Sequence, residues 1–285
     1  MLSGKNILVT GGSLGIGFAI AEACLRSGAR VMIVAREKKA LDEARDSLAK
    51  VDGAATVAAV TADVSDPASV EDVFETFTSS FGRLDGVVNS AGIYGPIGPI
   101  TDVDPQEWLK AIHVNLFGSF LVARAACSRM RTSGGGRIVL LSGGGAATPF
   151  PNYTAYATSK VAVVRLTETI AIEMAPFGIE VNAIAPGFVA TRLHEQTLAA
   201  GASAAGQAFL ETTKKQLAGG AVPPSVAANA SVLLLSDAAK GITGKFVAAP
   251  YDGWKDWPAH VSELQASDIF TLRRILPKER GMDWQ

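Results

Sequence analysis

Short runs of apolar, mostly β-branched residues alternate with longer helical patterns along nearly the whole chain. The runs predicted as strands are residues 5–10, 30–35, 55–60, 84–90, 137–142, 179–185 and 245–249. The segments predicted as helices are residues 16–27, 37–50, 67–81, 105–132, 153–176 and 224–236, and residues 186–222 are expected to be irregular. Strands that are separated by helical crossovers form parallel sheets with helices on both faces. The alternation therefore predicts an α/β fold with a single doubly wound sheet of about seven parallel strands.

Composition and charge narrow the class of protein. The chain of 285 residues is 48% apolar, which is enough for a sizeable core and excludes a mainly disordered chain. Its formal charge of −1 gives no reason to expect nucleic acid or an anionic membrane as a partner. No apolar run approaches the roughly 20 residues that span a bilayer, and the N-terminus lacks the pattern of a secretory signal. We therefore expect a cytoplasmic protein.

The cysteines and histidines are few and scattered. Cys24 and Cys127 are too far apart for a disulfide scaffold or a metal motif, and no metal site is expected. The three histidines, His113, His194 and His260, are expected on the surface or in packing.

A glycine-rich turn follows the first predicted strand. Residues 10–17 read TGGSLGIG, and a helical segment follows at once. Glycines there allow positive φ angles and let the backbone approach a pyrophosphate, which then meets the positive end of the helix dipole. An ordinary strand-to-helix turn is the alternative, but the position within a β-α-β pattern favours a Rossmann-type dinucleotide site. Its candidate cofactor-binding residues are Gly11, Ser13, Leu14, Gly15, Ile16 and Gly17.

The end of the second predicted strand bears on the choice of cofactor. An acidic residue that binds the ribose 2′-OH of NAD usually stands there, but this chain reads Val34-Ala35-Arg36. A guanidinium can pair with a 2′-phosphate, so Arg36 favours NADP(H) over NAD(H). A surface arginine at the start of a charged helix is the alternative.

Tyr156 and Lys160 lie four residues apart near the start of the predicted helix at 153–176. Residues at this spacing share one face of a helix, so the phenol and the ammonium group can act on one site. Ser142 ends the preceding strand, and ligands of doubly wound sheets bind at the carboxyl ends of the strands.

Together these motifs resemble those of the short-chain dehydrogenase/reductase family, in the branch with a TGxxxGxG turn. The resemblance covers residues 5 to about 250, and the motifs follow one another in the family's order. The matches are Thr10 to Gly17, Asp63, Val64, Asn89, Ser90, Ala91, Gly92, Asn115, Ser142, Tyr156, Lys160, Val181, Asn182, Pro186, Gly187 and Thr191.

The resemblance implies hydride transfer between a nicotinamide cofactor and a carbon that bears oxygen. Tyr156 would be the general acid/base, Lys160 would lower the pKa of Tyr156 and bond the nicotinamide ribose, and Asn115 would hold a water in a proton relay. Asp63 would bond the adenine amino group, and Asn89 would steady the central strand. The remaining cofactor-binding candidates are Val64, Ala91, Gly92, Pro186, Gly187, Val189 and Thr191, of which those at 186–191 would hold the nicotinamide carboxamide.

One departure from the family concerns catalysis. A serine that binds the substrate oxygen normally lies 13 positions before the tyrosine, and here that position is Gly143. Ser142 lies one place earlier and is followed by three glycines, which permit a bulge that could turn its side chain. We assign Ser142 as the catalytic serine, with backbone N–H groups or a water as the alternative. Ser90, in place of the family's asparagine, is a smaller change.

The motifs define one domain and an extension. Residues 1–253 are expected to form an NAD(P)-binding catalytic domain, in which residues about 190–222 occupy the place of the family's variable substrate lid. Residues 254–285 hold three of the four tryptophans. They are expected either to reach over the substrate cleft or a neighbouring subunit, or to cover their own domain with a helix at about 259–276. Tyr153 is expected to line the substrate cavity or to pack.

The leading hypothesis is an NADP(H)-dependent oxidoreductase that interconverts a small-molecule secondary alcohol and a ketone. The resemblance also implies a homodimer or a homotetramer. The alternative is a non-catalytic dinucleotide-binding sensor or regulatory protein with the same fold, since the displaced serine weakens the catalytic set.

Overall fold

The computed structural model describes residues 1–51 and 56–284, and within them the strands form one seven-stranded sheet. Its order is β3-β2-β1-β4-β5-β6-β7, and every pairing is parallel. The strands are β1 (Asn6–Thr10), β2 (Arg30–Ala35), β3 (Val57–Thr61), β4 (Gly86–Asn89), β5 (Gly136–Leu141), β6 (Ile179–Ala185) and β7 (Phe246–Ala248). The predicted doubly wound fold is therefore confirmed. The strand order reverses between β1 and β4, where such sheets open a ligand crevice.

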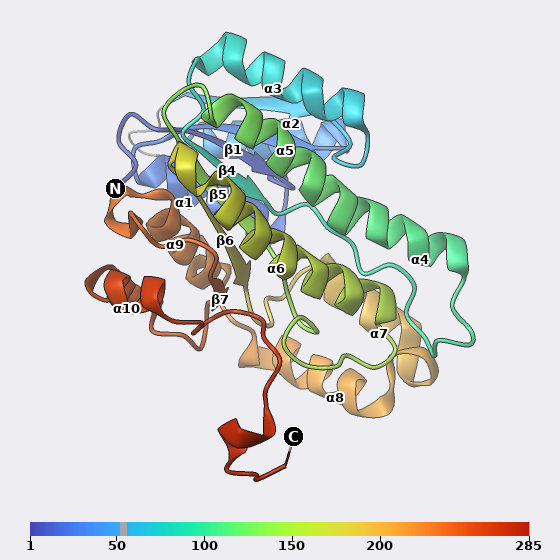
Figure 1. Cartoon of the computed structure of the whole chain (residues 1–285). Helices are drawn as coiled ribbons and strands as arrows, with labels where there is room; N and C mark the ends of the chain where they lie inside the picture. Colours follow the sequence, from blue (N-terminus) through green and yellow to red (C-terminus); the bar gives the residue numbers. More distant parts are fainter. Residues whose placement is uncertain (52–55, 285) are drawn as a thin grey trace.

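Helices cover both faces of the sheet (Figure 1). Side chains of β1 alternate between two buried clusters, because successive residues of a strand point to opposite faces. Ile7 and Val9 join the cluster that includes α1 (Gly15–Arg26), α2 (Lys38–Leu48) and α9 (Pro224–Leu235). Leu8 joins the cluster on the other face, which includes α3 (Pro67–Phe81), α5 (Gly118–Met130) and α6 (Thr154–Met174).

Two helices, α3 and α4 (Pro105–Ile112), begin with a proline that follows an aspartate cap. The Asp66 carboxylate accepts a hydrogen bond from the backbone N–H of Ser69, and the Asp104 carboxylate accepts bonds from Gln106 and Glu107. These side chains satisfy donors that have no partner within the first turn of a helix.

The predicted strand at 55–60 and the predicted helix at 105–132 need correction. The strand spans 57–61, and residue 55 lies outside the described residues. The long helix is α4 (Pro105–Ile112), a π-helical turn (His113–Phe117) and α5. A π turn widens one turn of a helix, and such turns are frequent at functional sites.

The prediction that residues 186–222 are irregular is wrong for most of that stretch. It contains α7 (Arg192–Ala205), α8 (Gln207–Lys215) and a further π-helical turn (Gln216–Gly220). Its many alanines favour helix, whereas the glycines interrupt it because they take positive φ angles. The φ angles are 70° at Gly201, 83° at Gly206 and 146° at Gly219.

The extension begins as part of the domain. Trp254 and Trp257 are buried in the cluster that contains α1 and α9, and α10 (Val261–Ala266) follows them. The helix predicted at about 259–276 is wrong beyond α10. The chain instead runs beside the sheet edge, where the N–H of Phe246 in β7 donates to the carbonyl of Phe270. Its last residues lie apart from the body of the molecule (Figure 1).

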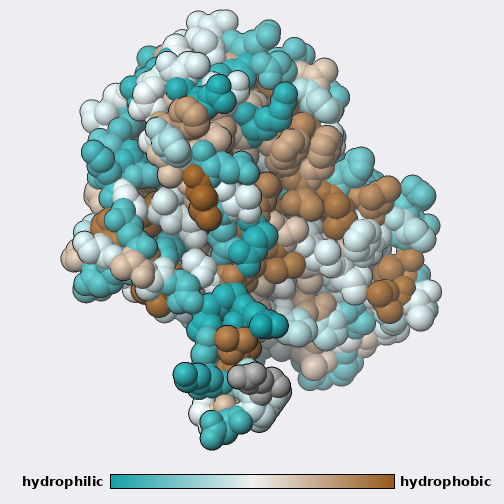
Figure 2. All heavy atoms as spheres, viewed as in Figure 1, coloured by the Kyte–Doolittle hydropathy of each residue, from teal (hydrophilic) through white to brown (hydrophobic). Residues whose placement is uncertain are grey.

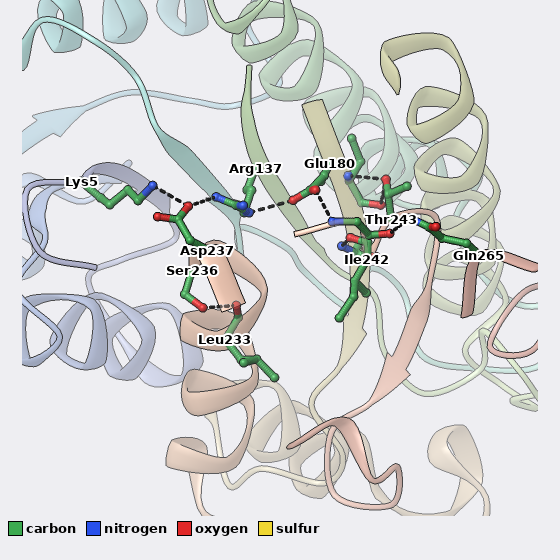
Figure 3. A network of polar contacts seen from close by, with 12 residues as sticks. Lys5, Arg137, Glu180, Leu233, Ser236, Asp237, Ile242, Thr243 and Gln265 are labelled. Carbon is green, nitrogen blue, oxygen red and sulfur yellow. Dashed lines mark hydrogen bonds and ion pairs between the residues drawn. The ribbon is translucent and has the colours of Figure 1, made fainter. Parts of the chain in front are cut away.

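A polar network anchors this extension at the amino ends of the strands (Figure 3). Asp237 accepts hydrogen bonds from Lys5 at 2.9 Å and from Arg137 at 3.0 Å, and Arg137 also binds Glu180 at 2.8 Å. Glu180 accepts from the backbone N–H of Gly241, whose carbonyl in turn accepts from Gln265 of α10. The network therefore joins the extension to the amino-terminal ends of the strands, which lie opposite the crevice.

One helical stretch, Pro105–Met130, is long and apolar enough to cross a membrane by length and composition. However, 61% of its apolar window is buried inside the fold, as in the core helix of a globular domain.

Candidate active site

The glycine turn between β1 and α1 fits a dinucleotide pyrophosphate. Gly11 and Gly15 take φ angles of 65° and 57°, which favour glycine. A Cβ on Gly11 would lie 2.8 Å from the backbone N of Ala91, and a Cβ on Gly17 would overlap the carbonyl of Gly11. Side chains at these positions would therefore fill the turn.

Helix α1 adds free donors to this turn. Its N-cap residue, Leu14, makes no capping hydrogen bond through its side chain. The first N–H groups of the helix thus face the turn together with the positive end of its dipole, an arrangement that binds phosphate. The predicted cofactor-binding residues Gly11, Ser13, Leu14, Gly15, Ile16 and Gly17 form this turn and the start of α1.

Arg36 and Asp63 meet at the carboxyl ends of β2 and β3. Their side chains lie 3.9 Å apart, and both are partly exposed. Ser65 fixes Asp63, because its N–H and its hydroxyl both donate to Oδ1 at 2.9 and 2.7 Å. Arg36 also lines a crevice of about 490 Å³ between α4 and α7, together with Ile93, Gly95, Ile97, Glu107, Lys110, Gln196 and Ala200.

Asn89 ties together the strands at the switch point. Its Oδ1 accepts from the hydroxyl of Thr10, and its Nδ2 donates to the hydroxyl of Ser119 at 2.8 Å. These buried bonds join β1, β4 and α5 at the carboxyl ends of the strands.

Segment 186–191 closes the crevice from the other side. Gly187 has a φ of 78°, and a Cβ there would overlap the ring of Pro250. A Cβ on Gly15 would lie 3.4 Å from Cγ2 of Thr191, so the segment reaches the glycine turn. The segment that contains Pro186, Gly187, Val189 and Thr191 therefore lies beside the glycine turn.

The catalytic candidates Tyr156 and Lys160 are buried on one face of α6. The Nζ of Lys160 donates to the carbonyl of Leu141 at 2.8 Å and lies 5.6 Å from the centroid of the Tyr156 ring. Burial lowers the pKa of Lys160 to about 8 and raises the pKa of Tyr156. The direction at Tyr156 is opposite to the one expected, because desolvation of the phenolate outweighs an ammonium group that is bonded elsewhere.

Asn115 lies in the π-helical turn and reaches both neighbouring elements. Its Oδ1 accepts from the N–H of Ile93 and its Nδ2 donates to the carbonyl of Ile93, both at 2.8 Å. Its Nδ2 also donates to the hydroxyl of Ser159 at 2.9 Å, which joins it to α6. A Cβ on Gly92 would lie 3.1 Å from Oδ1 of Asn115 and 3.3 Å from Nζ of Lys160, so the two side chains meet around Gly92.

Ser142 and Gly143 differ in what they face. The hydroxyl of Ser142 is buried and donates to the carbonyl of Lys160 at 2.9 Å. Gly143 lies against the hydroxyl of Tyr156, which a Cβ at this position would overlap. The residue 13 positions before the tyrosine therefore occupies the expected place beside it, but it has no side chain.

Sequence reasoning missed the aromatic residues that surround Tyr156. The ring centroid of Tyr94 lies 4.8 Å from that of Tyr156, and Phe150 stacks on Tyr153 at 4.3 Å. Phe209, from the lid helix α8, lies 4.8 Å from Phe150. The spacing of Tyr94 just after the Asn89–Gly92 motif was the available signal, whereas no periodicity pointed to Phe209. Tyr153 packs in this cluster, and its hydroxyl bonds Thr197 of α7 at 2.9 Å.

The histidines take different places. His113 and His260 are exposed, as expected. His194 is buried at the start of α7, where its ring lies 3.8 Å from that of Phe188 and 6.1 Å from that of Tyr94. Burial lowers the pKa of His194 to about 4, so its ring is neutral near pH 7.

Known proteins are similar to this chain over most of its length. A family model described as enoyl-(acyl carrier protein) reductase matches residues 11–249. D-threitol dehydrogenase of Mycolicibacterium smegmatis is 36% identical over 243 residues, which are 85% of this chain and 90% of that protein. The chain belongs to the short-chain dehydrogenase/reductase family. Levodione reductase of Leifsonia aquatica is 33% identical over 238 residues, which are 82% of this chain and 88% of that protein.

Solved structures of this family agree. The crystal structure of levodione reductase has a TM-score of 0.80 at 29% identity and covers 91% of this chain and 99% of its own. The structure of NAD+-bound xylitol dehydrogenase has a TM-score of 0.80 at 27% identity and covers 87% and 97%. This short-chain dehydrogenase/reductase is accordingly an NAD(P)-dependent oxidoreductase that acts on a CH–OH group, and its relatives do not favour a non-catalytic sensor.

Proposed function

We propose that this enzyme interconverts a secondary alcohol and a ketone with NADP(H), and that Tyr156 is its general acid/base. The observation that carries the proposal is the meeting of Tyr156, Lys160 and Asn115 at the carboxyl ends of β4 and β5, beside the glycine turn. In doubly wound sheets, ligands bind at the carboxyl ends of the strands.

The site favours a neutral Tyr156 before the reaction. Burial raises the pKa of its phenol, so near pH 7 the hydroxyl keeps its proton and can donate it to a ketone oxygen. When bound, the nicotinamide ring supplies the hydride for the carbon atom. Lys160, with its pKa lowered to about 8, can return a proton toward Tyr156, and Asn115 lies beside Lys160 at Gly92.

The preference for NADP(H) rests on Arg36. Its guanidinium lies at the carboxyl end of β2, where the family's NAD-binding members usually carry an acid. The pair with Asp63 is long at 3.9 Å and the arginine is largely exposed, so Arg36 can turn to a 2′-phosphate at little cost.

The aromatic surroundings of Tyr156 favour a cyclic or otherwise apolar substrate over an open-chain polyol. Tyr94, Tyr153 and Phe150 form one cluster with Tyr156, and Phe209 of the lid packs on it. Aromatic rings offer large apolar faces and few hydrogen bonds. Among relatives, levodione reductase bears the name of such a ketone, whereas D-threitol dehydrogenase bears that of a polyol.

Exposed apolar side chains on three helices support the expected homo-oligomer. Leu109 of α4, Phe120 of α5 and Ile172 of α6 are all exposed, and apolar surface gathers over this side of the molecule (Figure 2). Large exposed apolar patches commonly mark contacts between proteins. Light scattering on the purified protein measures its oligomeric state, and a monomer at micromolar concentration would contradict the homo-oligomer.

The expected location of the protein in the cell is the cytoplasm.

The test of the proposed function is a panel of cyclic and acyclic ketones followed at the nicotinamide absorbance band. We expect oxidation of NADPH by at least one ketone, and Tyr156→Phe should lower kcat by about 10²–10⁴-fold, the usual contribution of a general acid. NADPH should still bind to the variant. An unchanged kcat in Tyr156→Phe would disprove the assigned role.

A further inference from the structure

The substrate oxygen beside Tyr156 needs a second hydrogen-bond donor, and the serine does not supply it. The hydroxyl of Ser142 is already bonded to the carbonyl of Lys160, and the residue that faces the Tyr156 hydroxyl is Gly143. A donor placed where charge develops on the reacting oxygen is usually among the largest contributions to catalysis. The question rests on the proposed function, because it concerns the same oxygen.

The three glycines after β5 form a tight turn beside this oxygen. The N–H of Ala146 donates to the carbonyl of Gly143 at 3.3 Å, and Gly145 has a φ of 86°. The φ of Gly144 lies outside the positive range. This combination is that of a type II turn, with Gly144 at its second position and Gly145 at its third.

Among the described residues, the N–H groups of the three glycines of this turn have no acceptor. Within residues 1–51 and 56–284, the structure shows no hydrogen bond from the backbone N–H of Gly143, Gly144 or Gly145. Gly143 is buried, and buried N–H groups are almost always paired, whereas Gly144 is exposed and its N–H is open to a ligand. The N atom of Gly144 is two bonds from the Cα of Gly143. The hydroxyl of Tyr156 lies where a Cβ on that Cα would be.

We propose that the backbone N–H groups of the Gly143–Gly145 turn, with that of Gly144 as the main donor, bind the substrate oxygen in place of a serine hydroxyl. The ligand is the carbonyl oxygen of the ketone, or the alkoxide oxygen formed from it before Tyr156 delivers its proton. Backbone donors held in a turn need no reorganisation during the reaction, which is the basis of oxyanion holes in other enzymes.

The structure requires glycine at two of the three positions of the run, 143 and 145. A Cβ at Gly143 would overlap the Tyr156 hydroxyl, and the positive φ of Gly145 is strained for other residues. At Gly144 a Cβ would meet nothing within 4 Å, so a small side chain there would be tolerated.

Gly144 offers a matched pair of variants. Gly144→Pro removes the N–H, and proline is favoured at the second position of a type II turn, so the turn should survive. Gly144→Ala retains the N–H and has open space for its methyl group. Both variants are made in the full chain and measured with NADPH and a ketone that the wild type reduces.

We expect Gly144→Pro to lower kcat by about 10²–10³-fold relative to Gly144→Ala, as the removal of one oxyanion donor does in other enzymes. The dissociation constant for NADPH should agree within about twofold between the two variants, since the turn does not bind the pyrophosphate. Equal kcat values in the two variants would overturn the proposal.

Two measurements keep the outcomes distinct. If wild type reduces a ketone and Tyr156→Phe does not, equal Gly144 variants refute the backbone donor alone, whereas absence of any turnover in wild type refutes the proposed function and the donor with it. If Gly144→Pro melts at a much lower temperature than Gly144→Ala, Ser142→Ala decides. If kcat of Ser142→Ala falls by less than about tenfold, the backbone donor is supported. A larger fall would mean that the hydroxyl of Ser142 binds the substrate oxygen and would overturn the proposal.

Discussion

The ammonium group of Lys160 donates a hydrogen bond to the backbone carbonyl of Leu141 at 2.8 Å. The bond joins the second turn of α6 to the end of β5. Both ends are buried, so the lysine holds a charge where water cannot solvate it. The geometry that places Lys160 beside Tyr156 therefore has a cost in stability, which can be measured.

Lys160→Met should lower activity and raise stability at neutral pH. Burial lowers the pKa of Lys160 to about 8 from the ordinary 10.5, which corresponds to about 3 kcal/mol of destabilisation of the protonated form. The variant also loses the hydrogen bond to the carbonyl of Leu141, which offsets about 1–2 kcal/mol of the stability gained by removing the buried charge. We expect the free energy of unfolding in urea to rise by about 1–2 kcal/mol at pH 7.

The pH dependence identifies the cause. Because the folded pKa is the lower one, the cost is fully present below pH 8 and disappears as the pH rises toward 10.5. The difference in unfolding free energy between Lys160→Met and wild type should therefore shrink between pH 8 and pH 10. Lys214→Met, which changes an exposed lysine, is the control. A difference that does not vary with pH would mean that packing, and not charge, is responsible.

Arg36→Asp should reverse the choice of cofactor. Hydrogen bonds from a guanidinium to a charged group contribute about 1.5–3 kcal/mol, so we expect affinity for NADPH to fall by about 10–100-fold while affinity for NADH changes less. Titration calorimetry with both dinucleotides measures the ratio. Lys39→Asp makes the same change of charge nearby on α2 and should leave the ratio within about twofold. An unaltered preference in Arg36→Asp would show that another group binds the phosphate.

The alternation of strands and helices along the chain and the shared helix face of Tyr156 and Lys160 could be predicted from sequence because both depend on local patterns. Apolar runs with β-branched residues specify buried parallel strands, and a spacing of four specifies one helix face. Sequence could not show that Gly143, and not the assigned Ser142, lies against the Tyr156 hydroxyl, because a shift of one residue at the end of a strand depends on the turn that follows. In the structure, the hydroxyl of Ser142 donates to the carbonyl of Lys160, and Gly143 lies against the hydroxyl of Tyr156.

The lid and the extension were harder to predict for a different reason. Helix α7 is rich in alanine and contains Gly201, so its period is not apparent, and Gly206 between α7 and the short α8 suggests a loop. The extension after Ser267 is held by tertiary contacts: Lys245 donates to the carbonyls of Ser267 and Ile269, both at 3.0 Å. Contacts between distant segments have no signature in the local sequence.

Gly17→Ala should disrupt the dinucleotide turn. The added Cβ would overlap the carbonyl of Gly11, and backbone cannot move aside as a flexible side chain can. Overpacking of this kind costs about 1–3 kcal/mol, and we expect the affinity for NADPH to fall at least about tenfold. Gly98→Ala is the matched control, since its Cβ would lie 3.4 Å from Val103, an ordinary contact. Thermal melts with and without NADPH compare the two variants, and an equal ligand-induced shift in Tm would contradict the role of Gly17.

Trp257→Ala should show that the first part of the extension belongs to the domain. Trp257 is 4% exposed, and its ring lies 4.7 Å from that of Phe270, which in turn bonds β7 through its backbone. Truncation of a buried tryptophan costs about 3–5 kcal/mol, because the cavity it leaves closes only in part. Trp284→Ala removes the same side chain from a position that is 66% exposed and should change stability by less than about 0.5 kcal/mol. Urea unfolding measures both. If the two variants unfolded at the same urea concentration as wild type, the contacts of Trp257 would not stabilise the domain, and residues from 254 onward would form a separate appendage.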